Sequence, residues 1–281
     1  MTSAQLLQSI FDTALNNGYS DIHISTGMKP KIRDNNGYIG DIESVVIEGQ
    51  TLTPGIISKE VILQIIEQIA GKSGVLNFIE KKELDTSYEL DNNERYRVNC
   101  YMDSAGYSIA LRHIPSNIPT LESLGLPDHI REMCNKSKGL ILVTGPTGSG
   151  KSTNLAAMIN YINTHHKKHI ITIEDPIEFA FNSDRSLINQ REVGNTTHSF
   201  PDAIRSSLRE DPDVIMIGEM RDTETIQSAI RLAETGHLVI STLHTNDSVQ
   251  TIDRIVDIFP GPQQTQVRMQ LSQSLIGILA Q

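Results

Sequence analysis

The chain has 281 residues, enough for two domains or one large one with a sizeable core. Its formal net charge is −10, which makes nucleic acid a poor default partner because proteins that wrap nucleic acid are normally basic. No apolar run approaches the roughly 20 residues that span a bilayer, and no Lys or Arg precedes Lys29, so we expect neither direct membrane insertion nor a secretory signal peptide.

The first 113 residues have the pattern of a small mixed α+β domain. Apolar residues at helical spacing predict a helix over residues 1–16 and a second one that begins at Ser58 and ends at Gly71. Short alternating runs bounded by turn residues predict strands. The runs cover residues 21–25, 31–33, 38–39, 84–90, 96–102 and 107–113, with turns at 34–37, 91–93 and 103–106.

A proline-rich segment, residues 114–127, follows this domain. Because it contains three prolines and a glycine, we interpret it as an interdomain linker, with an ordinary surface loop as the alternative. From residue 128 to residue 281, apolar runs alternate with helical patterns, which predicts a mostly parallel sheet with helices on both faces. The expected strands are residues 140–143, 169–173, 214–217 and 237–243, and the expected helices lie near residues 152–164, 199–208, 222–235, 247–258 and 263–279.

The stretch Gly145–Ser152 fits the phosphate-loop pattern G-x-x-x-x-G-K-[ST] at every fixed position. A predicted strand precedes it and a predicted helix follows, which is the context that the motif needs and which disfavours a chance match. Lys151 is expected to reach the β- and γ-phosphates of ATP, and the Ser152 hydroxyl is expected to bind Mg²⁺. The predicted nucleotide-binding residues are Thr147, Gly148, Ser149, Gly150, Lys151, Ser152 and Thr153.

Acidic residues follow two of the predicted strands. Glu174, Asp175 and Glu178 come after residues 169–173, and Glu219 comes after residues 214–217, where Gly218 stands near the usual position of an aspartate. Ligands of open α/β sheets bind at the carboxyl ends of strands, where a carboxylate can hold Mg²⁺ or orient an attacking water. A solvated acidic loop is the alternative. We expect Glu219 either to bind Mg²⁺ or to hold one of its other ligands.

Histidines and arginines give less specific signals. His237 and His244 stand at the two ends of one predicted strand, where a structural role, a contact to the γ-phosphate and an intersubunit contact are all open. Arg97 and Arg112 lie on strands of the first domain. From a neighbouring subunit they could neutralise charge during phosphoryl transfer, and surface salt bridges are the alternative.

Several ordered motifs together resemble the secretion ATPase superfamily, and within it the PilT-like group of type IV pilus retraction motors. The resemblance extends over nearly the whole chain and is weaker over residues 38–60. The stretches that carry it are Ser20–His23, Tyr96–Asn99, Gly145–Ser152, Ile173–Phe179, Asn189–Val193, Leu208–Val214, Gly218–Asp222, Ala233–His237 and Thr242–Thr245.

The resemblance implies an α/β fold and a set of roles. It implies a PAS-like N-terminal domain over residues 1–113 and a RecA-like P-loop ATPase domain over residues 128–281, assembled as a homo-hexamer with ATP between the domains. By the same resemblance Glu178 is the catalytic glutamate and Glu219 the Walker B glutamate. His237 and His244 correspond to the family's histidine box, and Arg97 and Arg112 to arginines that approach the phosphates.

The function that the resemblance implies is Mg²⁺-dependent ATP hydrolysis that powers pilus retraction and twitching motility. It places the protein in the cytoplasm, at the inner membrane face, with a pilus platform protein as its partner. Because the family continues past the position of Gln281, we expect the chain to be truncated. The alternatives are a pilus-assembly or type II/IV secretion ATPase and an ATP-binding regulator without productive hydrolysis, which Glu178 and Glu219 argue against. The net charge disfavours DNA translocation.

Overall fold

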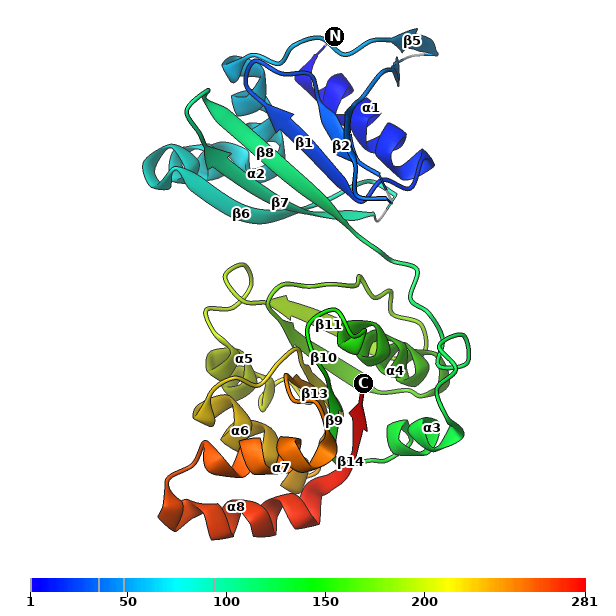
Figure 1. Cartoon of the computed structure of the whole chain (residues 1–281), viewed down its shortest axis with the longest axis vertical. Helices are drawn as coiled ribbons and strands as arrows, with labels where there is room; N and C mark the ends of the chain where they lie inside the picture. Colours follow the sequence, from blue (N-terminus) through cyan, green and yellow to red (C-terminus); the bar gives the residue numbers. More distant parts are fainter. Residues whose placement is uncertain (1, 35, 48, 93) are drawn as a thin grey trace. The chain divides into compact units, whose positions relative to one another are not determined.

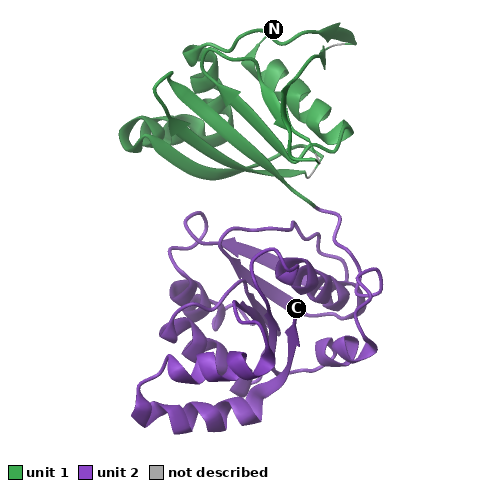
Figure 2. Ribbon diagram, viewed as in Figure 1, with its two compact units in different colours: residues 1–115 green, residues 116–281 purple. Residues whose placement is uncertain are grey.

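The computed structural model describes residues 2–34, 36–47, 49–92 and 94–281, and divides into two compact units. The N-terminal unit comprises residues 1–115 and the C-terminal unit residues 116–281 (Figure 2). Two of the predicted turns, at 34–37 and 91–93, include Asn35 and Asn93, which lie outside the described residues.

The N-terminal unit is a six-stranded antiparallel sheet with two helices (Figure 1). The sheet has the order β3-β2-β1-β8-β7-β6, and β4 and β5 form a separate pair. Apolar side chains of β1, β7 and β8 pack with those of α1 and α2 in a single core. The elements are α1 (Ser3–Asn16), β1 (Asp21–Ser25), β2 (Lys31–Arg33), β3 (Ile39–Asp41), β4 (Val45–Ile47), β5 (Gln50–Leu52), α2 (Lys59–Lys81), β6 (Glu83–Glu89), β7 (Arg95–Met102) and β8 (Tyr107–Ile114).

The predicted end of the second helix at Gly71 is a break within α2. Gly71 has φ 69° and ψ 179°, so the first helical segment stops there and a second continues to Lys81. Only glycine adopts this backbone region readily, which explains the residue type at the break. The second segment and the β4–β5 pair were not predicted from the sequence.

The C-terminal unit is a six-stranded, wholly parallel sheet with helices on both faces. Its strand order is β11-β10-β12-β13-β9-β14. One core lies between the sheet and α5 to α8, and the other between the sheet, α3 and α4. The elements are α3 (Asp128–Cys134), β9 (Gly139–Thr144), α4 (Lys151–His165), β10 (His169–Glu174), β11 (Leu187–Glu192), α5 (Phe200–Ser207), β12 (Val214–Ile217), α6 (Thr223–Glu234), β13 (Leu238–Leu243), α7 (Ser248–Asp257), α8 (Gly261–Ser274) and β14 (Leu275–Ala280).

The end of the chain differs from the prediction of a helix over residues 263–279. Helix α8 ends at Ser274, and Leu275–Ala280 forms β14, which pairs in parallel with β9. The run Leu-Ile-Gly-Ile-Leu-Ala is short, apolar and interrupted by Gly277, and such a composition does not distinguish a buried helix from a buried strand. Pairing with the edge of the buried strand β9 decides in favour of the strand.

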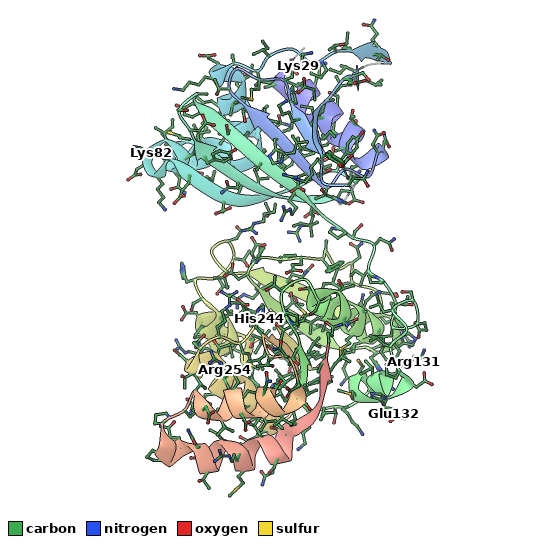
Figure 3. The ribbon with its side chains drawn as sticks, in the orientation of Figure 1. Lys29, Lys82, Arg131, Glu132, His244 and Arg254 are labelled. Carbon is green, nitrogen blue, oxygen red and sulfur yellow. The ribbon has the colours of Figure 1, made fainter. Side chains whose placement is uncertain are left out.

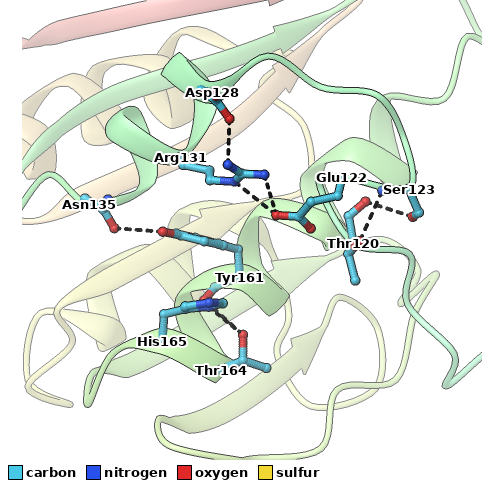
Figure 4. A network of polar contacts seen from close by, with 9 residues as sticks. All are labelled: Thr120, Glu122, Ser123, Asp128, Arg131, Asn135, Tyr161, Thr164 and His165. Carbon is cyan, nitrogen blue, oxygen red and sulfur yellow. Dashed lines mark hydrogen bonds and ion pairs between the residues drawn. The ribbon is translucent and has the colours of Figure 1, made fainter.

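The predicted linker is divided between the two units. Residues 114 and 115 belong to the N-terminal unit and residues 116–127 to the C-terminal unit, where Leu121 is buried in the core beside α4. Arg131 of α3 binds the carboxylates of both Glu122 and Asp128, with N–O distances of 2.7 and 2.6 Å (Figure 4). Residues 116–127 are therefore attached to the C-terminal unit by apolar and ionic contacts.

Candidate active site

The phosphate-loop sequence forms a glycine turn between β9 and α4. Gly145, Gly148 and Gly150 have φ values of 152°, 81° and 95°, and Gly150 is the N-cap of α4. A Cβ on Gly145 would lie 2.6 Å from Ser149 Oγ, so the turn is also too close-packed for a side chain there. The loop thus directs the N-terminus of a 15-residue helix, with its free N–H groups, at one end of the sheet.

A cavity of about 460 Å³ lies at this end of the sheet. Because β9, β10, β12 and β13 are parallel neighbours, their carboxyl ends meet at the same edge as the glycine turn. Eleven of the predicted site residues line this one cavity: Thr147, Gly148, Gly150, Lys151, Ser152, Thr153, Glu174, Asp175, Glu178, Glu219 and His244.

Lys151 is the buried cation of the cavity. It is 8% exposed, and its Nζ donates to the carbonyl oxygens of Gly145 at 3.0 Å and Pro146 at 2.9 Å. Burial lowers the pKa of its ammonium group below the ordinary value, while the carboxylates of Glu178 and Glu219 act in the opposite direction. Acids from two separate strand ends therefore exert their fields on the same lysine.

Glu219 is held by basic side chains on both sides. Its carboxylate lies 2.6 Å from Arg221 Nε and 3.5 Å from His244 Nε2. The backbone beneath it is fixed because Thr242 Oγ1 donates to the Gly218 carbonyl at 2.6 Å. His244, labelled in Figure 3, follows β13 and so reaches the acid that follows the neighbouring strand β12.

Glu174 is a buried carboxyl group at the end of β10. Its Oε1 accepts hydrogen bonds from Thr172 Oγ1 at 2.6 Å and from Gln190 Nε2 at 3.1 Å. Burial raises the pKa of Glu174 to about 7, although hydrogen bonds from Thr172, Gln190 and the Glu178 backbone N–H oppose that rise. Glu178 itself is exposed at the cavity, so the neighbouring acids have opposite environments.

Two predicted residues of this unit lie outside the cavity lining. Ser149 Oγ is buried and has no hydrogen-bond partner within the described part of the chain. His237 precedes β13, at the opposite end of the strand from His244, and its Nδ1 lies 3.2 Å from the carbonyl oxygen of Leu232. Since a strand residue spans about 3.3 Å, His237 and His244 are separated by roughly 20 Å and cannot act on one phosphate of the same subunit.

Arg97 and Arg112 belong to the N-terminal unit. They are direct partners across β7 and β8, and Arg112 is in turn opposite Asp21 of β1, which is opposite Arg33 of β2. Arg112 Nε donates to Asp21 Oδ1 at 2.7 Å, yet the arginine side chain remains 69% exposed. One row of the sheet therefore carries three arginines and one aspartate, an uncompensated positive charge that suits an anion.

Sequence reasoning missed several residues of the cavity. Arg221, Thr242, Phe179 and Phe181 also line it. All but Phe181 lie within motifs that carry the family resemblance, which was the available signal. Among the residues that the structure describes, no group of three or more His, Cys, Asp or Glu could hold a metal ion by itself, and no helix has the length and hydropathy to cross a membrane.

Proteins that are similar to this chain match residues of both units. A family model described as "Type II/IV secretion system protein" matches residues 84–281. The "Type IV pilus retractation ATPase PilT" of Pseudomonas aeruginosa is 45% identical over 264 residues, which make up 94% of this chain and 74% of that protein. A "Twitching motility protein" of Neisseria gonorrhoeae is 54% identical over 199 residues, 71% of this chain and 53% of that protein.

A solved structure is similar over almost the full length of the chain. It is the pilus retraction motor PilT with bound ADP, at 46% identity and a TM-score of 0.83. The match covers 96% of this chain and 76% of that one.

Proposed function

We propose a function from one premise: the chain belongs to the family of type II/IV secretion system proteins, and it is a nucleotide-binding ATPase of the pilus-retraction group. The predicted resemblance and the predicted α/β fold class are thereby confirmed. What we propose beyond this premise is the site chemistry, the assembly and the cellular role of this particular chain.

The proposed reaction is hydrolysis of ATP in the cavity beside the glycine turn. The turn and the N-terminus of α4 would bind the phosphates through backbone N–H groups, and Lys151 would exchange its carbonyl contacts for oxygens of the β- and γ-phosphates. One observation carries the proposal: Glu178 and Glu219, from different strand ends, both act on the Lys151 ammonium in one cavity.

Glu178 is the residue that we assign to the attacking water. It is exposed at the cavity, so it can accept a hydrogen bond from water and hold one lone pair of that water toward the γ-phosphorus. Glu174 cannot serve equally well, because its Oε1 already accepts two hydrogen bonds from the protein. In this proposal Glu174 is a structural acid and Glu178 the catalytic residue.

The oxygen donors at the cavity fit a magnesium ion. Ser152 and Glu219 would hold it, with Asp175 placed to contact its waters, and the hard oxygen donors match its preference. Sites for Mg²⁺ with ATP usually have one or two protein ligands, since phosphate oxygens and waters complete the shell. When bound, the ion would neutralise charge on the phosphate oxygens. Arg221 and His244 keep the Glu219 carboxylate in place for this purpose.

The cellular role that we infer is retraction of a type IV pilus by a cytoplasmic hexamer at the inner membrane, acting on a pilus platform protein. The exposed Arg97 and Arg112 would approach the phosphates of a neighbouring subunit, and His237 would contact a neighbour rather than its own nucleotide. Opening and closing of the N-terminal unit during the cycle would supply the mechanical step.

The experiment that tests the site compares two purified variants with the wild type. Lys151→Ala should lose ATP binding and hydrolysis together, because it removes the cation at the phosphates. Glu178→Ala should bind ATP within a few-fold of the wild type and yet lower phosphate release by ~100-fold or more. Wild-type turnover by Glu178→Ala would refute its assigned role.

The description of the family also covers secretion proteins, so a secretion or assembly motor is the second candidate. Deletion of the gene separates the two. Loss of a retraction motor leaves cells that carry excess pili and do not twitch. Loss of an assembly motor leaves cells without pili.

A further inference from the structure

The loop that carries Glu178 is attached to β11 by side chains of that strand. Gln190 of β11 makes three of the contacts. Its Oε1 accepts from the Phe181 N–H at 2.9 Å, and its Nε2 donates to the Phe179 carbonyl at 2.9 Å and to Glu174 Oε1 at 3.1 Å. Gln190 does not line the cavity, so it reaches the site only through these groups.

The parallel register of β10 and β11 explains why these side chains converge. Thr172 is opposite Gln190, and Glu174 is opposite Glu192, so the four side chains lie in two rows on one face. Glu192 Oε2 accepts from the Ile177 N–H at 3.0 Å, so side chains of β11 bind both Ile177 and Phe179, the two neighbours of Glu178. The backbone on both sides of Glu178 is therefore held by side chains of the sheet.

The second half of the loop has a separate anchor on α4. The Asn163 side chain is 2% exposed, donates to the Asn182 carbonyl at 2.8 Å, and accepts from the Asp184 N–H at 3.0 Å. Loss of Gln190 would thus release residues 179–181 while leaving residues 182–186 attached.

We propose that Gln190 is the positioning residue of the active site, because its carboxamide fixes the backbone of residues 179–181 and thereby sets the Glu178 carboxylate at the γ-phosphate. The inference rests on the proposed role of Glu178. A misplacement of about 1 Å in a catalytic group can lower a rate by ~100-fold, so we expect hydrogen bonds at Phe179 and Phe181, one and three residues beyond Glu178, to have a measurable effect.

The first test is Gln190→Met, which keeps the length of the side chain and removes its hydrogen bonds. Turnover should fall ~10-fold or more while the KM for ATP changes less than about 3-fold, since the phosphate loop is untouched. The matched control is Asn189→Leu. Asn189 is the preceding residue, and its amide oxygen lies 2.9 Å from His169 Nε2 rather than at the loop. This control should retain wild-type turnover.

A double-mutant cycle separates positioning from a general loss of structure. If Gln190 acts only through Glu178, adding Gln190→Met to Glu178→Ala should change the residual rate less than about 2-fold. A further ~10-fold fall in the double variant would overturn the inference. Wild-type turnover by Glu178→Ala would overturn the proposed function together with this inference. An inactive Glu178→Ala beside a fully active Gln190→Met would overturn the inference alone.

Hydrogen exchange provides a readout that does not depend on turnover. In Gln190→Met the Phe181 amide should exchange ~10-fold faster or more, because it has lost its acceptor, while the Asp184 amide keeps wild-type protection. Equal exchange of Phe181 in both proteins would contradict the contact on which the inference depends. Faster exchange throughout β9 and β12 would indicate general unfolding and would also contradict it.

Discussion

Glu174 carries its carboxyl group in surroundings that disfavour the ionised form. Its pKa is raised to about 7 because the group is buried, whereas the ordinary value in the unfolded chain is 4.5. Between these two pH values the native state binds more protons than the unfolded state, so stability must fall as pH rises. The fall begins near pH 4.5 and ends near pH 7, and a shift of this size corresponds to ~3 kcal/mol.

Glu174→Gln should remove this dependence, because the amide does not ionise. We expect the wild type to lose up to ~3 kcal/mol of unfolding free energy between pH 5 and pH 8 relative to the variant. The measurement is urea unfolding at both pH values without nucleotide or magnesium. The exposed Glu132→Gln on α3 is the control and should behave as the wild type. Parallel pH curves for Glu174→Gln and the wild type would contradict the raised pKa.

At the level of single residues, motif spacing predicted most of the cavity and missed the groups that support it. Lys151, Glu178 and Glu219 follow strands whose carboxyl ends must meet, so their convergence could be foreseen. Ser149 and His237 could not be placed, because a motif gives the residues of a loop or strand but not the direction in which each one points. Gln190 lies within the Asn189–Val193 motif, but the motif does not show its contacts, because these depend on the register of β11 against β10.

Among the helices, α2 contains the most informative break. Gly71 has a backbone conformation that is essentially restricted to glycine, and a Cβ there would meet no atom within 4 Å. Gly71→Ala should therefore destabilise the N-terminal unit through backbone strain alone, by ~1–3 kcal/mol. Gly55→Ala is the control, because Gly55 also has open space but no positive φ, and it should be neutral or slightly stabilising. Thermal unfolding of both variants checks this, and equal melting temperatures would count against strain.

At the level of elements, strong periodicity predicted well and short or polar segments did not. The buried strands β9, β10, β12 and β13 and the helices α4 to α7 agree closely with their predicted ranges, because each has a continuous or periodic apolar pattern. Strand β11 has two adjacent apolar residues followed by four polar ones, and α3 has only seven residues, so neither shows an apolar period in the sequence. The sequence of β14 alone did not distinguish a strand from a helix, and its pairing with β9 does.

At the level of the whole molecule, the row that contains Arg97, Arg112 and Arg33 leads us to expect that ATP hydrolysis depends on assembly of the subunits. If the protein forms a hexamer, light scattering should give six times 31.1 kDa, about 187 kDa, in the presence of ATP. A strict monomer under the same conditions would contradict the proposed assembly.

Mixing two inactive variants then tests whether an arginine acts on the neighbouring subunit. Lys151→Ala and Arg112→Ala should each be inactive. In an equal mixture, about a quarter of the interfaces should combine an intact Lys151 from one subunit with an intact Arg112 from its neighbour, so about a quarter of the wild-type phosphate release should return. Arg112→Lys, mixed in the same way, controls for loss of the guanidinium geometry. Without any regained phosphate release, Arg112 would have to act within its own subunit or not at all.

The central claim is that ATP is split in the cavity beside the glycine turn by Glu178 opposite Lys151. The most direct measurement is an experimental structure of this chain with Mg²⁺ and a non-hydrolysable ATP analogue. The account predicts the β- and γ-phosphates on Lys151 Nζ, the ion on the Ser152 hydroxyl, and one water between the γ-phosphate and the Glu178 carboxylate. A nucleotide bound elsewhere, or a Glu178 carboxylate too far from the γ-phosphate for one water to connect them, would contradict it.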